Sequence, residues 1–391
     1  MKKDSCKITF TGDIGFDRYM DGKWRDNNLL SKTILKFCRN SDHVIANVEG
    51  AVVPSEKINI KNTDDYCHFI NSDAICVLSK INADIWNLAN NHIMDVGEYG
   101  LISTLKLARQ NNSLTIGAGR NIAEASKPVI LNDAGGIGII SVGYAPDCLP
   151  ATDENAGVFS MSDHALIKKK IEEVKRICRW CIIVAHGGEE FTNLPSPYTR
   201  DRYIKFMEFG ADIIVCHHPH VVMNYEMFDK KAIFYSLGNF IFDTDYQRAQ
   251  YNTERGVILK LIFNENEFCF ECLGLKTNRE KGNISDYAVP EIFTDIPEEE
   301  YEKLLPLSAK AFVWAEKKRK KFLHPEAFNN FSEAEWEKYL LSEKREEYIK
   351  GETMDFSVIL PIAKKEQKKG WETSSLSGVK EYILGQISKE I

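Results

Sequence analysis

The chain has 391 residues, of which 43% are hydrophobic and 27% are charged, so it can bury a sizeable core and is long enough for two domains. Its formal net charge of -7 argues against a broad nucleic-acid-binding surface, which normally requires a basic excess, and we expect no nucleic-acid partner. The ten cysteines are scattered without a repeating frame, which favours reduced thiols over a disulfide framework.

The beginning of the chain does not have the pattern of a secretory signal. It carries two early lysines but lacks the apolar stretch of about 7 to 15 residues that such a signal requires. No run of about 18 apolar residues occurs elsewhere, so we expect no integral membrane segment. We therefore expect a cytoplasmic location.

Short β-rich apolar runs alternate with helical patterns up to about residue 245, which is typical of a layered α/β architecture. The expected strands are Lys7 to Phe10, His43 to Ala46, Asp84 to Ala89, Gly136 to Val142, Cys181 to Ala185 and Asp212 to Cys216. The expected helices between them are Tyr99 to Arg109, Asp163 to Arg176 and Arg200 to Phe209. A second β-rich stretch, 221–275, has no helical pattern between its strands, which predicts antiparallel pairing.

The composition shifts to Glu, Lys and aromatic residues beyond about residue 290. The helical patterns there are Tyr301 to Phe322 and Glu333 to Lys350. Ser332 and Glu335 have the spacing of a capping box at the start of the second pattern. We predict a first domain over residues 1–285 and a mainly helical C-terminal extension over residues 286–391.

Five of the expected strands run directly into polar clusters. The clusters are Thr11-Gly12-Asp13, Asn47-Val48-Glu49, Asn90-Asn91-His92, His186-Gly187-Gly188-Glu189 and His217-His218-Pro219-His220. Ligands bind at the carboxyl ends of strands in open α/β sheets, so these clusters can converge. Imidazoles, carboxylates and an amide oxygen suit zinc, manganese or iron(II). The sequence therefore predicts a divalent metal site built from His186, His218 and His220 together with Asp13, Glu49 and Asn91.

The histidine pair at 218 and 220 has the most informative spacing. Ligands at i and i+2 of an extended segment project to the same side, and Pro219 biases His218 toward extended geometry. The alternative is a polar loop with solvated histidines. Asp13 and Glu49 each stand beside a glycine, so each is also compatible with an ordinary turn. Asn239 follows another expected strand and is also compatible with a polar turn.

Three motifs are specific in combination: NNHxxDxGxxGL at 90–101, HHPHV at 217–221 and YSLGNF at 235–240. The other stretches that share the pattern are Thr11 to Phe16, Asn47 to Gly50, Gly117 to Ala125 and His186 to Phe191. Together these segments resemble the bacterial capsule-synthesis CapA family, also called the poly-gamma-glutamate synthesis family. The resemblance implies the calcineurin-like metallophosphoesterase fold, a four-layer sandwich of two mixed sheets flanked by helices, to which this chain adds its C-terminal helical extension.

The resemblance also implies roles for the clustered residues. Asp13 and His220 would bind a first metal ion, and Glu49 would bridge it to a second. The residues implied to bind the second ion are Asn91, His186 and His218. His92, the histidine after the motif asparagine, would be the general acid. Gly15 stands where the wider phosphoesterase pattern has a histidine, and Glu49 where that pattern has an aspartate.

The main functional hypothesis is a metal-dependent, phosphoesterase-like hydrolase in capsule or surface-polymer biosynthesis, with two Mn, Zn or Fe ions. Its substrate would be an anionic small molecule or polymer, and its partners the proteins of a polymer-synthesis assembly. The candidates for substrate contact are Arg18, Asn47, Glu189 and Asn239, with Arg200 as a further cationic candidate. One alternative is an amide hydrolase that acts on a γ-linked polymer. The other is a non-catalytic scaffold that binds an anionic polymer or a partner assembly through a relic metal site. This alternative is motivated by Gly15, which stands where the wider pattern has a metal-binding histidine.

Overall fold

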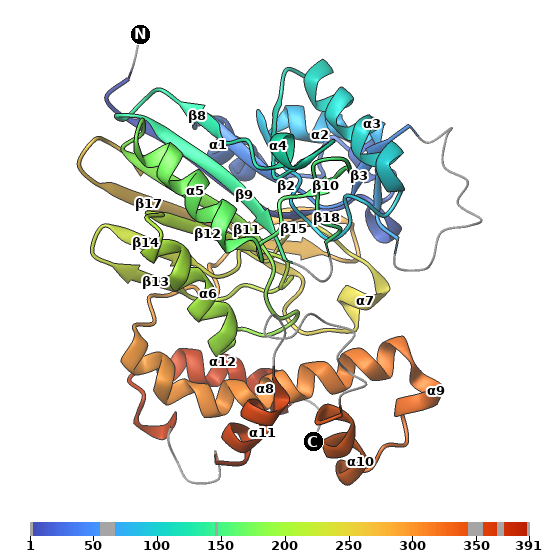
Figure 1. The fold of residues 1–391 in the computed structure, drawn as a ribbon. Helices are drawn as coiled ribbons and strands as arrows, with labels where there is room; N and C mark the ends of the chain where they lie inside the picture. The colour runs from blue at the N-terminus through green and yellow to red at the C-terminus, as the bar shows by residue number, and fades with distance from the viewer. Residues whose placement is uncertain (1–2, 55–66, 145–147, 343–354, 366–370, 389–391) are drawn as a thin grey trace.

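The computed structural model describes residues 3–54, 67–144, 148–342, 355–365 and 371–388 (Figure 1). Within these ranges, two large mixed β-sheets pack face to face, and helices cover their outer faces. The expected four-layer sandwich is therefore confirmed. None of the helices in these ranges combines the length and the apolar character needed to cross a bilayer.

The first sheet is parallel at one side and antiparallel at the other. In order across it lie β18 (Asn283–Tyr287), β17 (Phe268–Asn278), β16 (Arg255–Phe263), β1 (Cys6–Ile14), β2 (His43–Val48), β5 (Ile85–Asn87) and β6 (Leu114–Ile116), with β15 (Asn239–Ile241) also paired to β1. Strands β1, β2, β5 and β6 are parallel, whereas β16, β17 and β18 pair in antiparallel fashion.

The second sheet has the same mixed character. Across it lie β13 (Tyr225–Phe228), β14 (Lys231–Phe234), β12 (Ile213–His217), β11 (Trp180–His186), β9 (Ile137–Gly143) and β8 (Val129–Leu131). Its central strands are parallel, and β13 pairs with β14 in antiparallel fashion. The antiparallel pairing expected for 221–275 is confirmed for β13 with β14 and for β16 with β17, whereas β14 and β15 also pair in parallel with β12 and β1, and a short helix at 245–248 interrupts the stretch. Two small sheets join β3 (Ala51–Val53) to β4 (Phe69–Asn71) and β7 (Ala118–Gly119) to β10 (Gly157–Val158).

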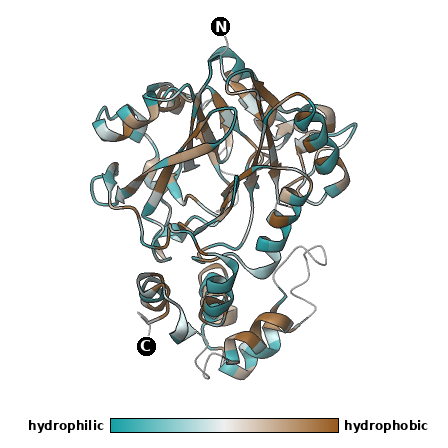
Figure 2. Ribbon diagram, turned by 90° about the vertical axis from the view of Figure 1, so that its left-hand side faces the viewer, coloured by the Kyte–Doolittle hydropathy of each residue, from teal (hydrophilic) through white to brown (hydrophobic). Residues whose placement is uncertain are grey.

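Alternating side chains divide the apolar residues of each central strand between two cores. In β2, Ile45 packs between the sheets, whereas Val44 and Ala46 face the outer helices. In β11, Ile182 points inward and Ile183 outward. Figure 2 shows the result, with hydrophobic strands inside and hydrophilic helix faces outside.

The outer helices bury one face each against a sheet. The first sheet is covered by α1 (Lys32–Arg39), α2 (Ile75–Lys80) and α3 (Gly97–Gln110), and the second by α5 (His164–Lys175) and α6 (Pro197–Glu208). Short helices α4 (Ile122–Ala125) and α7 (Asp245–Arg248) connect strands. The expected helices at 99–109, 163–176 and 200–209 are thus present, with ends shifted by one to three residues.

Helices of the C-terminal part lie together at one end of the sheets (Figure 1). They are α8 (Glu298–Leu323), α9 (Pro325–Phe328), α10 (Glu333–Leu340), α11 (Phe356–Lys365) and α12 (Ser377–Ser388). Ser332 and Glu335 form the expected capping box of α10, and the part of the pattern from 343 to 350 lies outside the described residues. Leu304 and Leu307 of α8 and Ile383 of α12 join the core between the sheets. The division into domains at 285/286 stays a prediction.

Two strand boundaries differ from the sequence-based expectation in ways that affect the site. Strand β1 continues to Ile14, so Asp13 lies within the strand rather than after it. Pairing with β2 on one side and β15 on the other extends β1, with a register irregularity near Asp13. Strand β5 instead ends at Asn87, and the polar cluster from Asn90 begins three residues later.

A buried ion pair anchors α6 to the edge of the second sheet. Arg200 donates from Nε and Nη2 to the two carboxylate oxygens of Glu226 in β13, at 3.0 and 2.7 Å. The hydroxyl of Tyr235 also donates to Glu226, and Arg200 lies 3.4 Å from the carboxylate of Glu298 at the start of α8. Arg200 is only 6% exposed and is held by these contacts, so the prediction that it holds a substrate is wrong.

We expect Glu226→Ala to lower the free energy of unfolding by about 3 to 5 kcal/mol, because it leaves a buried guanidinium without its carboxylate. The matched control is Glu208→Ala in α6, the helix that carries Arg200, since Glu208 is more than half exposed in its pair with Lys205 and such pairs contribute at most about 1 kcal/mol. Urea unfolding measures both changes. Equal losses in the two variants would contradict this assignment.

Candidate metal centre

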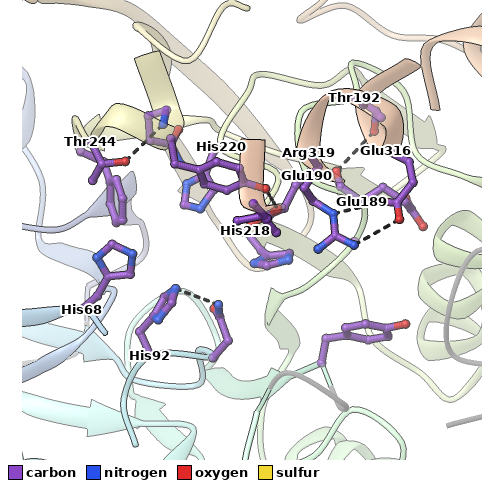
Figure 3. Close-up of a pocket in the computed structure, with 18 of the residues that line it drawn as sticks. His68, His92, Glu189, Glu190, Thr192, His218, His220, Thr244, Glu316 and Arg319 are labelled. Carbon is purple, nitrogen blue, oxygen red and sulfur yellow. Dashed lines mark hydrogen bonds and ion pairs between the residues drawn. The ribbon is translucent and has the colours of Figure 1, made fainter. Parts of the chain in front are cut away.

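A cavity of about 590 Å³ opens where the carboxyl ends of the central strands meet helix α8. Strand-end residues that line it include Asn91, His92, Glu190, His218 and His220. Figure 3 shows His218 and His220 in the middle of the lining residues, with His92 and His68 on one side and Glu190 and Arg319 on the other. The expected convergence of strand-end clusters is therefore present in the structure.

Two acidic side chains are buried behind His220, one of the residues that line this cavity. Asp13 in β1 and Glu49 after β2 both have no solvent exposure. Among the described residues, neither carboxylate oxygen of Glu49 has a hydrogen-bond partner, and Oδ2 of Asp13 has none. Burial, reinforced by Asp13 and Glu190, raises the pKa of Glu49 well above its usual value. Uncompensated buried carboxylates are costly, so this arrangement calls for a positive charge.

His220 lies between these two carboxylates. Its Nδ1 is 3.3 Å from Oδ2 of Asp13, and its Nε2 is 3.5 Å from Oε1 of Glu49. Burial alone would lower the pKa of His220, but Glu49 and Asp13 raise it to about 10. Asn239 also contacts Nδ1 through its Oδ1 at 3.0 Å. With no other cation present, a protonated His220 would therefore supply the positive charge.

A second set of donors surrounds the other side of Glu49. His186 Nε2 lies 2.9 Å from Asn91 Oδ1 and 3.7 Å from Glu49 Oε1. The ring of His218 packs beside that of His186, with centroids 5.1 Å apart, and Nδ1 of His218 is buried without a hydrogen-bond partner in the described part of the chain. Burial lowers the pKa of His186, which favours the neutral imidazole that a metal requires.

These residues form two overlapping groups of metal-binding atoms. Asp13, Glu49 and His220 make one group, and within it the ligand atoms all lie within 4.8 Å of one another. The second group consists of Glu49, His186 and His218. Glu49 is common to both, as expected for a bridging carboxylate. The unpartnered buried oxygens and nitrogens, in a mixed carboxylate and imidazole set, fit a pair of divalent ions.

The backbone at His218 and His220 is not extended. Their φ angles are 96° and 58°, in the left-handed region that non-glycine residues rarely adopt. The extended geometry expected from Pro219 is therefore wrong. A tight turn instead directs both imidazoles into the cavity, and a strained backbone of this kind is typical of functional sites.

Glu190 joins the site, although sequence reasoning selected only its neighbour Glu189. A carboxylate oxygen of Glu190 and ring nitrogens of His218 and His220 all lie within 4.8 Å of one another. Glu190 also accepts a hydrogen bond from the hydroxyl of Tyr246 at 2.9 Å. Glu189 also lines the cavity, but its oxygens accept hydrogen bonds from the backbone and side chain at the start of α6. The HGGEE run was a usable signal, because both carboxylates follow the histidine at the end of β11.

Gly15 has a steric explanation. A Cβ at this position would lie 2.7 Å from the ring of Phe242. That ring lies on His220, with centroids 4.9 Å apart, and also contacts His68. The space that a histidine at position 15 would need is therefore filled by Phe242.

His92 is held between a carboxylate and an amide. Its Nδ1 lies 2.8 Å from Oδ2 of Asp95, and its Nε2 accepts a hydrogen bond from Nδ2 of Asn91 at 2.9 Å. The ring of His68 packs edge-on against it, and Asp17 binds His68 through Nδ1. Sequence reasoning missed His68, because no motif surrounds it.

The other expected substrate contacts are placed differently. Asn47 is fully buried and donates from Nδ2 to Asp13 at 2.7 Å and toward His186 at 3.3 Å. Asn239 is also buried and contacts Nδ1 of His220. We therefore reassign Asn47 and Asn239 from substrate contact to positioning of the candidate ligands. Arg18 is exposed on a 3-10 turn, outside the residues that line the cavity.

Helix α8 forms the wall opposite these histidines. Its residues in the lining are Phe312, Ala315, Glu316, Arg319 and Leu323. Arg319 donates from Nε to Glu316 at 3.0 Å, and its charge helps to lower the pKa of Glu190, which burial would otherwise raise. The wall thus carries a guanidinium into a cavity otherwise rich in carboxylates and imidazoles.

Comparison with known proteins gives a consistent result. A capsule biosynthesis protein CapA of Bacillus anthracis is 29% identical over 258 residues, which cover 64% of this chain and 62% of that protein. A PGA biosynthesis protein CapA of Bacillus subtilis (strain 168) is 32% identical over 254 residues, which cover 63% and 66%. The matched part spans less than two thirds of either relative.

A solved structure of a protein from Thermus thermophilus aligns with 68% of this chain and 98% of its own, at a TM-score of 0.35 and 8% identity, which is too weak to support an inference. The family model described as bacterial capsule synthesis protein PGA_cap matches residues 7–244, and it includes every strand-end ligand described above. Since that match covers more than half of the chain, the protein belongs to the bacterial capsule synthesis family PGA_cap.

Proposed function

We propose that the protein is a metal-dependent hydrolase of the phosphoesterase type that acts on an anionic substrate in capsule or surface-polymer biosynthesis. The observation that supports this most directly is the pair of ligand groups that share Glu49 next to the cavity. The biological context comes from the relatives, which are named as capsule and PGA biosynthesis proteins.

Asp13, Glu49 and His220 would hold one ion, and Glu49, His186 and His218 the other, with Asn91 and Glu190 as additional oxygen donors. Two divalent ions would supply Lewis acidity and a water nucleophile at neutral pH. Asn47 hydrogen-bonds to Asp13, and Asn239 to His220. These hydrogen bonds fix the orientation of the two ligating side chains.

His92 would deliver the proton that a leaving group requires. Asp95 accepts the N–H of its Nδ1, so Nε2 faces Asn91 and the cavity. It can serve as an acid only when Nε2 also carries a proton. Arg319 on the opposite wall would attract an anionic group of the substrate.

A γ-linked amide is the alternative substrate bond, and the name of the Bacillus subtilis relative supports testing it. Parallel assays on a phosphodiester and on poly-γ-glutamate distinguish the two. Deleting the C-terminal helices would not separate a scaffold from an enzyme, because α8 contributes both to the core and to the cavity wall.

Purified protein should contain manganese, zinc or iron, and should hydrolyse bis(p-nitrophenyl) phosphate when loaded. His218→Ala removes a ligand of the second group, so it should lose metal and activity together. Elemental analysis and the release of nitrophenol measure the two effects. A wild-type protein that binds none of these metals, even when they are added, would sink the proposal.

The two adjacent glutamates allow a matched test of the ligand assignment. Glu190→Gln should weaken binding of Mn²⁺ or Zn²⁺ by at least about tenfold, because the amide loses the charge that faces His218 and His220. Glu189→Gln should leave metal affinity unchanged and lower the free energy of unfolding by about 0.5 to 1.5 kcal/mol, because it weakens hydrogen bonds to the first turn of α6. Calorimetric titration and urea unfolding report these outcomes, and an equal loss of affinity in both variants contradicts the assignment.

The role of His92 predicts a specific pH dependence. Burial holds the pKa of His92 below its usual value of 6.5. A general acid is active when protonated, so kcat/KM should fall as pH rises through this lowered pKa. His92→Ala should reduce kcat by about 10² to 10⁴-fold, with unchanged metal content, and should remove that limb of the profile. A rate that instead rises through the same pKa would identify His92 as a base.

A further inference from the structure

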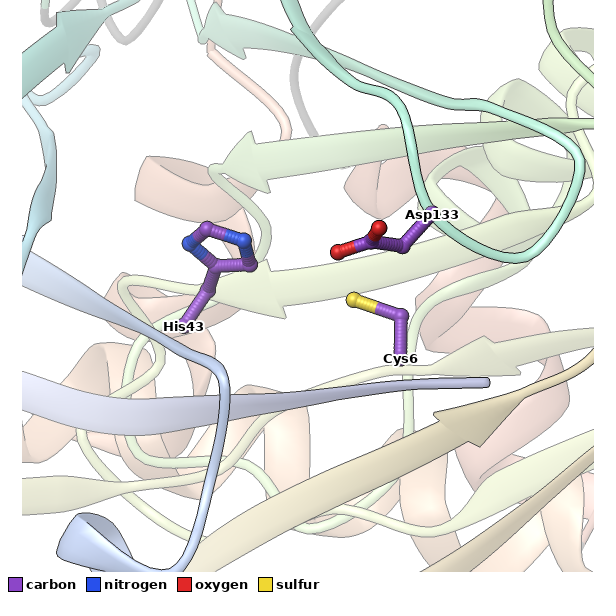
Figure 4. A group of neighbouring side chains, drawn as sticks. All are labelled: Cys6, His43 and Asp133. Carbon is purple, nitrogen blue, oxygen red and sulfur yellow. The ribbon is translucent and has the colours of Figure 1, made fainter. Parts of the chain in front are cut away.

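A separate group of metal-binding side chains lies at the edge of the sheets opposite the cavity. Cys6, His43 and Asp133 point toward one another, and their ligand atoms all lie within 4.8 Å of one another (Figure 4). Cys6 begins β1, whose other end carries Asp13. At about 3.3 Å per residue, the two groups are roughly 20 Å apart.

A carboxylate behind the ring orients His43. Nδ1 of His43 lies 2.7 Å from Oδ2 of Asp84, whose other oxygen accepts the backbone N–H of Val44 at 2.8 Å. Histidines that bind metals commonly donate their second ring N–H to a carboxylate, which fixes the tautomer and increases the basicity of the ligating nitrogen. This contact leaves Nε2 of His43 as the ligand.

Asp133 reaches the group from the second sheet. It lies in the turn between β8 and β9, which continues through three residues of positive φ, Ala134, Gly135 and Gly136. The backbone N–H of Lys3 donates to Asp133 Oδ1 at 2.8 Å, and that of Ala134 donates to Lys3 O at 3.0 Å. The three potential ligands therefore come from both sheets.

The chemical types select zinc rather than a hard cation. Thiolate, imidazole and carboxylate bind zinc at about 2.0 to 2.3 Å, which places tetrahedral ligands about 3.3 to 3.8 Å apart. Because the present ligand atoms all lie within 4.8 Å of one another, a closure of at most roughly 1 to 1.5 Å brings them to those separations. Magnesium and calcium prefer oxygen ligands alone.

The charge around this group also favours a cation. Asp42 and Asp84 act on the Cys6 thiol electrostatically in addition to Asp133. Lys3 is a positively charged neighbour, but its side chain is 62% exposed and forms an ion pair with Asp42. A buried thiol among three carboxylates is a favourable setting for a divalent ion.

We propose that Cys6, His43 and Asp133 bind a zinc ion, with water at the fourth position. On binding, the Cys6 thiol releases its proton to solvent and the resulting thiolate bonds to zinc. The ion ties the starts of β1 and β2 to the β8–β9 turn of the second sheet. It is a structural clamp and does not depend on the hydrolase proposal.

Cobalt(II) titration of the full chain tests this site without an activity assay. A thiolate bound to cobalt gives a charge-transfer absorption in the near ultraviolet, and the described ligand groups of the candidate metal centre contain no sulfur. The wild-type protein should show this band, and zinc should displace it. Cys6→Ala should abolish the band, whereas Cys38→Ala, at a cysteine that is equally buried but outside the group, should retain it.

Asp133→Asn keeps the shape of the turn residue. The cobalt affinity measured from the charge-transfer absorption should fall by at least about tenfold in this variant. It also decides the question if Cys6→Ala does not fold. Zinc should raise the Tm of Cys38→Ala by more than that of Cys6→Ala. Only Cys38→Ala retains the site at Cys6, His43 and Asp133 in addition to the candidate metal centre. A wild-type protein without the band, or a band that persists unchanged in Cys6→Ala or Asp133→Asn, overturns the proposal.

Discussion

The burial of Asp13 and Glu49 side by side, without enough hydrogen-bond donors among the described residues, is the constraint on which the site depends. Removing a carboxylate from water is expensive unless a positive charge or several donors replace the lost hydration. Only His220 faces both side chains within the described cluster, and its raised pKa reflects that position. The protein thus buries two carboxylates next to the histidines of the cavity, an arrangement that favours the binding of a cation.

The sheets make this concentration of charge possible. Strands β1, β2 and β11 are rigidly paired and packed on both faces, so the residues at their carboxyl ends are held in place without contributing to the core themselves. Behind these residues, Asn47 links Asp13 to Asn87, and Asn239 links His220 to the β15 segment. A neutral amide suits this task, because it bonds to carboxylate and imidazole alike and adds no further charge to the buried layer.

The fold and the convergence of the candidate ligands were largely predictable, because the first follows from the pattern of apolar runs and the second from the positions of the polar clusters after them. The continuous apolar runs in β2 and β11 predict strands with two buried faces, and the rule for strand ends then brings Glu49 and His186 together although they are far apart in the chain. The turn at His218 was not predictable in this way, and the rule does not tell which of the two glutamates after His186 faces the histidines. Both depend on left-handed backbone angles in short loops, which the residue types there do not require.

His68 and Arg319 were missed for a different reason. Each lies in a segment whose local pattern is uninformative about its partner, since His68 precedes a short strand and Arg319 lies on a helix with many other charged residues. An amphipathic pattern predicts that α8 packs against something, but only the tertiary structure shows that its partners are the inner core and the cavity. The same limit applies to Cys6 and Asp133, which belong to different sheets.

The position of α8 also has a consequence for how the protein is made. All the strand-end ligands described above precede residue 221, whereas the wall that encloses them begins at Glu298. During synthesis, the ligand-bearing strands therefore leave the ribosome well before the helix that covers their ends. The candidate ligands of a nascent chain are therefore open to solvent on this face, and the cavity takes its final shape only when the last helices dock.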